Sequence, residues 1–335
     1  MLKVAILGIG YWGPNLVRNF MMNPNTEVAA CCDLKIDRLS YIKSLYPTIT
    51  VTRDHNELIT HSEINLVAIC TPVDTHFEFA KKVLDAGKHV LIEKPMTASS
   101  QQAEELINLA EQKNLRIFVD HTFLFTGAVK KIKELIVAKE IGDLYYFDSV
   151  RINLGLFQHD VNVLWDLAPH DISIMHYLLE RKPHSVVATG ADHTGSGLEN
   201  VAYMTVYFSD NLLAHFHANW LSPVKIRQTL IAGSKKMIVW DDNQPSDKVR
   251  IYDKGIEIVN SSDDVYNMLI QYRTGDMYSP KLATKEALAT EVEHIYDCIN
   301  NNKKPLVDGH AGWMVVRILE AAQESIKNRG REVQI

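Results

Sequence analysis

The chain has 335 residues, of which 46% are hydrophobic and 23% are charged, and 35 basic against 41 acidic residues give a net charge of −6. This length predicts two domains, and this composition excludes a disordered chain, a collagen-like fibre and a small disulfide-rich scaffold. A mildly acidic chain has no general electrostatic attraction to nucleic acid or to an anionic membrane, so we expect neither as a partner.

The sequence carries no sign of export. Its opening segment reaches glycine at position 8 before an apolar signal region forms, and no apolar run approaches the roughly 18 residues of a spanning helix. The four cysteines, Cys31, Cys32, Cys70 and Cys298, form no C-x-x-C pair. We therefore expect a cytoplasmic protein with reduced, mostly buried thiols, and a reactive thiol is the alternative.

The first third of the chain alternates short apolar runs with amphipathic segments. We expect strands over 3–8, 27–33, 65–71, 89–93 and 116–120, a short strand at Val51, and helices over 14–22, 36–45, 75–86 and 99–113. Strands that are apolar on both faces and are each followed by a helix predict a parallel sheet covered on both sides. We therefore predict an α/β fold that begins with a doubly wound Rossmann domain over 1–122.

The pattern changes after this point. Helices are expected over 127–139, 165–179, 286–300 and 311–328, strands over 144–153, 185–192, 199–208, 212–220, 226–240 and 249–258, and polar loops over 195–198 and 259–264. Polar and apolar residues alternate over 203–208, which is typical of an antiparallel sheet with two unlike faces. The prediction is a C-terminal α+β domain over 123–335 with a large, mostly antiparallel sheet.

A glycine-rich turn follows the first strand. Gly8, Gly10 and Gly13 match G-x-G-x-x-G, with Tyr11 and Trp12 between the second and third glycines. The first glycine permits the turn, the second lets a pyrophosphate approach the backbone, and the third lets the helix pack closely. Because the motif lies between a strand and a helix, we expect these five residues to bind a dinucleotide, with phosphates at the helix N-terminus.

Asp33 ends the second strand, 20 positions after the last glycine. A carboxylate there accepts hydrogen bonds from the adenosine ribose and repels a 2′-phosphate, so NAD is favoured over NADP. The neighbouring cations Lys35 and Arg38 reduce this preference for NAD over NADP.

Three further motifs point to a known protein family. They are Thr71-Pro72 with His76, Glu93-Lys94-Pro95, and Asp166-x-x-x-His170. Together with the glycine turn and Asp33, they resemble the Gfo/Idh/MocA family of oxidoreductases across essentially the whole chain. The resemblance implies that Thr71, Pro72 and His76 line NAD, that Glu93 and Lys94 lie near the nicotinamide ribose, and that the Lys94–Pro95 peptide bond is cis. It also implies that Asp166 and His170 face the nicotinamide from the second domain.

These groups suit the oxidation of a secondary alcohol. A base takes the hydroxyl proton while the carbinol hydrogen leaves as hydride to the nicotinamide. His170 is the first candidate for the base, because imidazole titrates near neutral pH, and Asp166 either orients the imidazole or stabilises its cation. Lys94 polarises the carbonyl, binds the hydroxyl or shares the role of base, and the residues leave these alternatives open.

Polar residues near the predicted pair suggest the substrate. Arg151 and Asn153 end one strand, a loop with Gln158, His159 and Asn162 follows, and Lys225 and Arg227 share a face of a later strand. They are either solvated strand ends or contacts to a hydroxyl-rich substrate that carries phosphate. We predict that Arg151, Asn153, Asn162, His170 and Lys94 contact substrate.

The resemblance is strongest to family members that oxidise the C3 hydroxyl of nucleotide-linked sugars such as UDP-N-acetylglucosamine, whose 3-keto product a sugar transaminase then uses. The alternatives are a free-sugar or inositol dehydrogenase, an NAD-using glycosidase of the same superfamily, and an NAD sensor without catalysis. His215 and His217 lie two apart on one strand and could ligate a metal, but no diagnostic third ligand accompanies them, so no metal is expected.

The resemblance also implies a homodimer or homotetramer that pairs through the open face of the second sheet. Phe208, Phe216, Trp220 and Trp240 either contribute to such a face or lie beneath a layer of helices.

Overall fold

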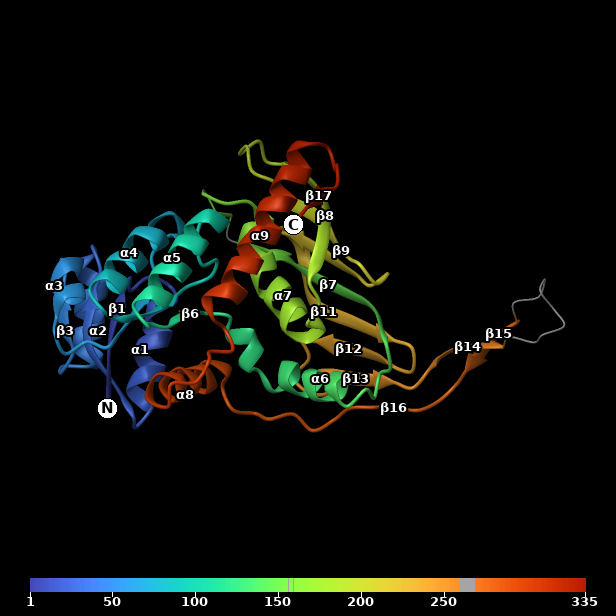
Figure 1. The fold of residues 1–335 in the computed structure, drawn as a ribbon, viewed down its shortest axis with the longest axis horizontal. Helices are drawn as coiled ribbons and strands as arrows, with labels where there is room; N and C mark the ends of the chain where they lie inside the picture. Colours follow the sequence, from blue (N-terminus) through green and yellow to red (C-terminus); the bar gives the residue numbers. More distant parts are fainter. Residues whose placement is uncertain (156, 159, 260–268) are drawn as a thin grey trace. The chain divides into compact units, whose positions relative to one another are not determined.

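The computed structural model describes residues 1–155, 157–158, 160–259 and 269–335 (Figure 1). The chain divides into two compact units, the first formed by Met1–Thr126 and Lys285–Glu320 and the second by Gly127–Thr284 and Ala321–Ile335. The first division lies close to the predicted boundary at residue 122. The segment Lys285–Glu320 differs from the prediction, because it belongs to the first unit rather than the second.

Helix α8 (Ala287–Asn300) explains this difference. Its apolar face carries Leu288, Val292, Ile295 and Cys298, which all lie in one hydrophobic cluster with Leu16 and Phe20 of α1. An amphipathic pattern predicts a buried face but not the element that buries it, so the sequence could not assign this helix to its sheet.

The first unit contains a six-stranded parallel sheet in the order β3-β2-β1-β4-β5-β6. The strands are β1 (Leu2–Leu7), β2 (Thr26–Cys32), β3 (Thr50–Thr52), β4 (Leu66–Ile69), β5 (His89–Ile92) and β6 (Ile117–Val119). The other elements of this unit are α1 (Gly13–Met22), α2 (Ile36–Leu45), α3 (His55–Thr60), α4 (Val73–Asp85), α5 (Ser100–Gln112), η1 (Thr122–Phe125) and α8, and α9 (Gly309–Lys327) contributes to both units. All the predicted elements of this region are present, and the short helix α3, which begins at the Asp54 cap, is an addition.

The order of the strands indicates where in the parallel sheet a ligand binds. From β1 the chain proceeds to β2 and β3 on one side and then to β4, β5 and β6 on the other, so the order reverses between β1 and β4. In open parallel sheets a ligand binds at the carboxyl ends of the strands beside this reversal. The sequence prediction of a doubly wound domain is confirmed.

The second unit contains a nine-stranded, mostly antiparallel sheet in the order β16-β13-β12-β11-β7-β10-β9-β8-β17 and a separate pair, β14-β15. The strands are β7 (Leu144–Leu154), β8 (Pro183–Ala191), β9 (Val201–Phe208), β10 (Leu213–Asn219), β11 (Leu221–Gly233), β12 (Met237–Asp241), β13 (Val249–Tyr252), β14 (Gly255–Val259), β15 (Leu269–Arg273), β16 (Met277–Tyr278) and β17 (Val333–Gln334). Its helices are α6 (Gly127–Val137), α7 (Val163–Leu179) and the end of α9. β7 and β10 form a parallel pair within this sheet.

Two predicted strands are each divided in the structure. The run 226–240 comprises β11 and β12, because the chain turns at Gly233, whose N–H donates to the carbonyl of Lys236. The run 249–258 comprises β13 and β14, which belong to different sheets. The polar stretches 233–236 and 253–255, each with a glycine, were the available signal for these turns. The predicted loop over 259–264 lies outside the described residues from position 260 onward.

Helix α7 packs on one face of the large sheet, against β7, β9 and β10. Phe208, Phe216, Trp220 and Trp240 are between 1% and 7% exposed and lie on this covered side. Of the two alternatives for these aromatic residues, the structure therefore supports the covering layer of helices. The opposite face carries exposed Tyr203, Tyr207 and Leu213.

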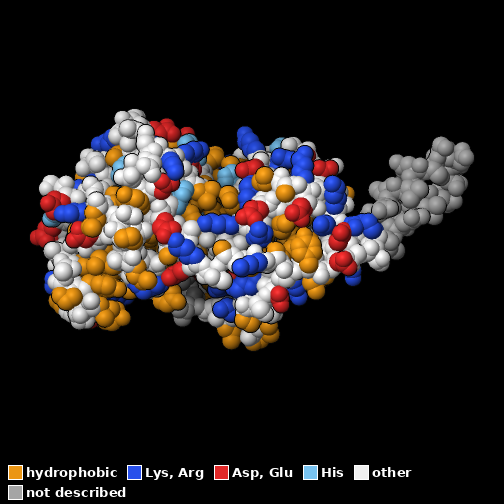
Figure 2. All heavy atoms as spheres, turned by 90° about the horizontal axis from the view of Figure 1, so that it is seen from below, with side chains coloured by type: hydrophobic (Ala, Val, Ile, Leu, Met, Phe, Trp, Pro, Cys, Tyr) orange, Lys and Arg blue, Asp and Glu red, His pale blue; other side chains and the backbone are white. Residues whose placement is uncertain are grey.

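The surface is mixed in charge. On the face that Figure 2 shows, basic and acidic side chains are interspersed, as the small net charge leads one to expect. Across the described residues, none of the helices has the length and apolar character needed to cross a membrane. All four cysteines are free, and burial raises the pKa of Cys31 to about 12 and of Cys298 to about 11, so these thiols stay protonated.

Candidate active site

The glycine turn has the geometry that its sequence predicts. Gly8 has φ +97°, a conformation that L side chains rarely adopt, and a Cβ there would lie 2.6 Å from the Cys70 carbonyl oxygen. A Cβ on Gly13 would lie 2.2 Å from the Gly8 oxygen. Both positions therefore require glycine for the fold itself, whether or not a ligand is bound.

Gly10 differs from its two neighbours in the motif. The atom nearest to a Cβ at this position would be Arg38 Nη1, at 3.7 Å, and the backbone needs no positive φ. The space beside Gly10 is therefore open to a ligand.

The Gly10→Ala variant should fold as the wild type does, because its methyl group meets no backbone, but it should bind NAD about tenfold or more weakly. Gly13→Ala is the contrasting variant and should lose stability instead. Thermal unfolding and calorimetric titration with NAD check both outcomes. Unchanged NAD affinity in Gly10→Ala would place the pyrophosphate elsewhere.

Asp33 supports the same turn. Its Oδ2 accepts from the Ile9 N–H at 2.7 Å and its Oδ1 accepts from the Lys35 N–H at 2.8 Å, while Arg38 Nη1 lies 3.4 Å from Oδ2. A carboxylate accepts about four hydrogen bonds, so these contacts leave capacity for ribose hydroxyls. Arg38 is partly exposed beside this carboxylate, a position that suits its predicted effect of reducing the preference for NAD over NADP.

Replacing Asp33 by alanine should weaken NAD binding about 10- to 100-fold, the equivalent of one or two hydrogen bonds to a charged group. It should weaken NADP binding much less, since Arg38 then meets a 2′-phosphate without competition from a carboxylate. Dissociation constants of both cofactors in Asp33→Ala and in Asp33→Ala/Arg38→Ala measure the effect. A loss that is equal for NAD and NADP would contradict the predicted ribose contact.

His76 joins the loop after β4 to the loop after β5. Its Nε2 lies 2.8 Å from the Thr71 carbonyl oxygen and its Nδ1 lies 3.0 Å from the Pro95 carbonyl oxygen. Burial lowers the pKa of His76, although the two backbone contacts oppose that shift. With 1% exposure, the imidazole supports the two predicted cofactor loops from within the protein.

Thr71 and Pro72 open helix α4. Pro72 is the N-cap residue of α4, and Thr75 Oγ1 donates to Thr71 Oγ1 at 2.7 Å and also contacts the Pro72 carbonyl oxygen. Glu93 and Lys94 follow β5 and are half-buried, and the Lys94–Pro95 peptide bond is cis, as expected.

The predicted cofactor residues therefore share one edge. Gly8 follows β1, Asp33 follows β2, Thr71 follows β4 and Glu93 follows β5 at the carboxyl ends of neighbouring parallel strands. The N-cap residue of α1, Trp12, has no acceptor in its side chain, so the first N–H groups of the helix can bind an anion. Tyr11 is 91% exposed beside them. This edge fits a dinucleotide.

The second unit carries the predicted acid–base pair on α7. Asp166 and His170 are four residues apart, so they lie on one face of the helix, and both are half-buried. Trp220 Nε1 donates to Asp166 Oδ2 at 3.0 Å, which fixes the carboxylate. Helix α7 begins at Val163 rather than at the expected residue 165, and Pro169 lies in its interior.

Asn162 has a clear local role. Its Oδ1 accepts from the N–H groups of Leu164 and Trp165, which caps α7, and its Nδ2 donates to Glu199 and Gln323. The side chain is 2% exposed. The cap thus positions the helix that carries Asp166 and His170, and the predicted contact of Asn162 with substrate stays a prediction.

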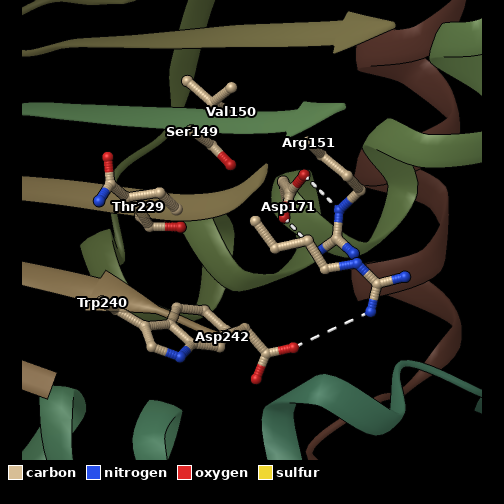
Figure 3. Close-up of a pocket in the computed structure, with 9 residues that line it drawn as sticks. Ser149, Val150, Arg151, Asp171, Thr229, Trp240 and Asp242 are labelled. Carbon is tan, nitrogen blue, oxygen red and sulfur yellow. Dashed lines mark hydrogen bonds and ion pairs between the residues drawn. The ribbon is translucent and has the colours of Figure 1, made fainter. Parts of the chain in front are cut away.

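Arg151 is similarly engaged. Its Nε and Nη2 donate to the two carboxylate oxygens of Asp171 at 2.8 and 2.7 Å, and both side chains are 6% exposed (Figure 3). Beside them, Ser149, Thr229, Trp240 and Asp242 help to line a cavity of about 10 Å³. Arg227 approaches Asp242 in the same cavity, at 3.9 Å. This buried ion pair gives Arg151 a structural role besides the predicted substrate contact.

The remaining predicted substrate residues are less constrained. Asn153 is half-buried on β7, two positions from Arg151 and so on the same face of the strand, and Gln158 is exposed. His159 lies outside the described residues.

His215 and His217 lie on the other side of the sheet from α7, because the alternate residues of β10 are the buried ones. The ring of Tyr203 stacks on His217 with centroids 4.4 Å apart, and Thr205 Oγ1 lies 3.0 Å from His215 Nδ1. Among the residues that the structure describes, no group of three or more His, Cys, Asp or Glu could hold a metal ion.

Two buried acidic residues to which the sequence assigns no role lie near each other, Asp120 and Glu291. Asp120 ends the run 116–120 as Asp33 ends its own strand, and Glu291 interrupts the apolar face of α8. An acid on an otherwise apolar helix face was the available signal.

Comparisons with known proteins agree with this architecture. Residues 2–121 match the model of an oxidoreductase family with an NAD-binding Rossmann fold, and residues 133–335 match the model of the C-terminal alpha/beta domain of that family. The UDP-N-acetylglucosamine 3-dehydrogenase of Acidithiobacillus ferrooxidans is 27% identical over 270 residues, or 78% of this chain and 77% of that enzyme. The myo-inositol 2-dehydrogenase of Thermotoga maritima is 22% identical over 98% of this chain and 97% of that enzyme.

Solved structures share the whole fold. The UDP-N-acetylglucosamine 3-dehydrogenase GnnA from Acidithiobacillus ferrooxidans has a TM-score of 0.81 at 21% identity and covers 98% of both chains. GenD2 from gentamicin A biosynthesis, in complex with NAD, has a TM-score of 0.83 at 19% identity, over 100% of this chain and 96% of that one. This chain spans between 30% and 97% of the length of the curated relatives that it matches.

Proposed function

The chain belongs to the Gfo/Idh/MocA family of NAD-binding oxidoreductases, and we propose that it oxidises the C3 hydroxyl of a nucleotide-linked sugar such as UDP-N-acetylglucosamine. The similarity to UDP-N-acetylglucosamine 3-dehydrogenase over most of both chains supports this substrate class. The structural observation on which the proposal mainly rests is the Asp166–His170 pair, in which Trp220 donates a hydrogen bond to the Asp166 carboxylate.

The acid–base steps follow from these side chains. His170 accepts the proton of the substrate hydroxyl, and Asp166, fixed by the Trp220 indole, orients the ring and stabilises its cation. Lys94, at the end of β5, donates a hydrogen bond to the reacting oxygen. NAD, when bound, accepts the hydride.

The test is NADH absorbance with purified protein, NAD and a panel of UDP- and dTDP-linked sugars, with a sugar transaminase and its amino donor added to remove the 3-keto product. A signal with one UDP-linked N-acetylhexosamine would support the proposal and name the substrate. We expect such a transaminase to be the next enzyme to use the product. Silence across the panel would count against a nucleotide-linked sugar.

A free polyol is the second candidate, because the myo-inositol 2-dehydrogenase of Thermotoga maritima matches nearly the whole chain. Turnover of inositol or free sugars that does not depend on a nucleotide would favour this alternative. Release of an aglycone without net NADH would favour an NAD-using glycosidase instead.

We also propose a homodimer or homotetramer that forms through the sheet face opposite α7. Tyr203, Tyr207 and Leu213 on that face are 44%, 40% and 38% exposed, an apolar character that suits contact with a second copy. Light scattering of the purified protein should give a dimer or tetramer mass, and a monomer at micromolar concentration would contradict this assembly.

A further inference from the structure

A small cavity lies in the second unit between helix α7 and the large sheet (Figure 3). Side chains of β7, β11 and β12 line it from the sheet, and Asp171 lines it from α7. Its volume is about 10 Å³, which is close to the smallest space that holds one water molecule. A sugar or a nucleotide is far too large for this cavity.

Two buried hydroxyl groups of the sheet line the cavity. Ser149 of β7 and Thr229 of β11 are directly opposite each other in the antiparallel register, so their side chains lie side by side on one face of the sheet. The two residues are 2% and 4% exposed. Figure 3 shows both hydroxyl oxygens turned toward the space beside Asp171.

These hydroxyl groups lack partners within the protein. Across the described ranges of the chain, neither Ser149 Oγ nor Thr229 Oγ1 forms a hydrogen bond to another residue. A buried hydroxyl group that makes no hydrogen bond destabilises the folded state, because it has given up its bonds to solvent. A ligand that can both donate and accept would satisfy both groups at once.

The Asp171 carboxylate brings an acceptor to the same cavity. Arg151 donates one hydrogen bond to each of its two oxygens, at 2.8 and 2.7 Å. A carboxylate accepts about four hydrogen bonds, so about two acceptor positions remain on this buried group. A buried ion pair is stable only where such remaining positions are also satisfied.

The charges around the cavity favour a neutral ligand. Arg151 pairs with Asp171 at 2.7 Å, and Arg227 pairs with Asp242 at 3.9 Å, so two positive charges balance two negative ones. A bound cation or anion would add an uncompensated charge beside a buried ion pair. Water has no net charge and forms two to four hydrogen bonds with buried polar groups.

We propose that this cavity binds one water molecule, which donates to the Asp171 carboxylate and bonds to the hydroxyl groups of Ser149 and Thr229. One hydroxyl group donates to the water oxygen, and the other accepts the second water proton. This water connects β7 and β11 to α7 beside His170 and completes the hydrogen bonding of the Arg151–Asp171 pair. Its binding requires neither NAD nor substrate, so it is tested separately from the proposed function.

A high-resolution crystal structure of the wild-type protein tests the site directly. We expect one peak of electron density within hydrogen-bond distance of Ser149 Oγ, Thr229 Oγ1 and an oxygen of Asp171. The peak should disappear in the Ser149→Ala/Thr229→Val variant. A cavity without density in the wild type, or density with the anomalous signal of chloride or a metal ion, would overturn the proposal.

Thr229→Val tests the water in solution, because valine has nearly the shape of threonine and lacks its hydroxyl group. If the hydroxyl group binds water, the variant should lose one neutral hydrogen bond, and its folding equilibrium constant should fall about 2- to 10-fold. If the cavity is dry, the variant should become more stable, since an unsatisfied buried hydroxyl group is removed. Urea denaturation distinguishes these opposite signs.

Thr189→Val is the matched control, because Thr189 is exposed on β8 and the change reports only the different strand propensities of threonine and valine. After this correction, a Thr229→Val variant at least as stable as the wild type would contradict the bound water.

Ser149→Ala gives a second measurement with a smaller change in the side chain, and it too should reduce stability. Both hydroxyl groups hold the same water, so the loss in Ser149→Ala/Thr229→Val should be smaller than the sum of the two single losses. Additive losses, or a Ser149→Ala variant as stable as the wild type, would contradict a water shared by the two residues.

Discussion

Replacing His170 by alanine should abolish most of the turnover of this enzyme and leave NAD binding intact. Removal of a general base typically costs about 10²- to 10⁴-fold in rate, and His170 lies on α7 of the second unit, whereas the dinucleotide edge belongs to the first. We expect kcat to fall within this range. Steady-state kinetics and NAD titration measure the two properties separately.

Lys94→Ala should give a loss of the same order, because Lys94 is predicted to bind the reacting oxygen. The Asp166→Asn variant should retain more activity than His170→Ala, since Asn keeps the oxygen that accepts from Trp220 but not the negative charge. His193→Ala and Lys81→Ala are matched controls at exposed positions outside the site. If His170→Ala and Lys94→Ala both kept wild-type rates, the assignment of the catalytic residues would be wrong.

Breaking the buried ion pair should have the largest effect on stability. Arg151→Met leaves Asp171 buried without its bidentate partner, and removal of one member of such a pair costs about 3–5 kcal/mol in the free energy of unfolding. The double variant Arg151→Met/Asp171→Leu removes both charges and should recover much of that loss. Urea denaturation of the wild type, the single variants and the double variant measures the coupling.

This experiment also distinguishes two roles of Arg151. A structural role predicts that stability falls in Arg151→Met and returns in the double variant. A role in substrate binding predicts a raised KM in the double variant, although its stability has recovered. A single variant with wild-type stability and a raised KM would show that the ion pair with Asp171 contributes little to the fold.

The first unit was predictable because its signals are local. Gly8 has a positive φ, and Gly13 lies close to the Gly8 carbonyl. Both conditions depend only on a few neighbouring atoms and require glycine, so the glycines in the sequence reveal them. Asp33 was predictable for the same reason, because its position directly after β2 depends only on where that strand ends. Apolar runs that alternate with amphipathic helices likewise predicted the parallel sheet.

Charged residues in the second unit were harder to interpret. Arg151 at a strand end and Asn162 in a loop have the residue types of ligand contacts, yet the structure gives one an ion pair with Asp171 and the other a helix cap. A polar side chain has similar donors whether it meets substrate or protein. The sequence alone therefore could not separate these roles.

The sequence by itself determined the doubly wound domain, the mostly antiparallel second sheet and the residues at the strand ends, because each depends on periodicity or on short-range backbone geometry. Only the tertiary structure decided that α8 joins the first unit, that Trp220 holds Asp166 and that Trp12 donates to Asp120. These two hydrogen bonds join residues that are 54 and 108 positions apart. Tertiary packing determines which residues meet in such contacts. A single sequence indicates which faces of helices and strands are buried, but not which elements cover them.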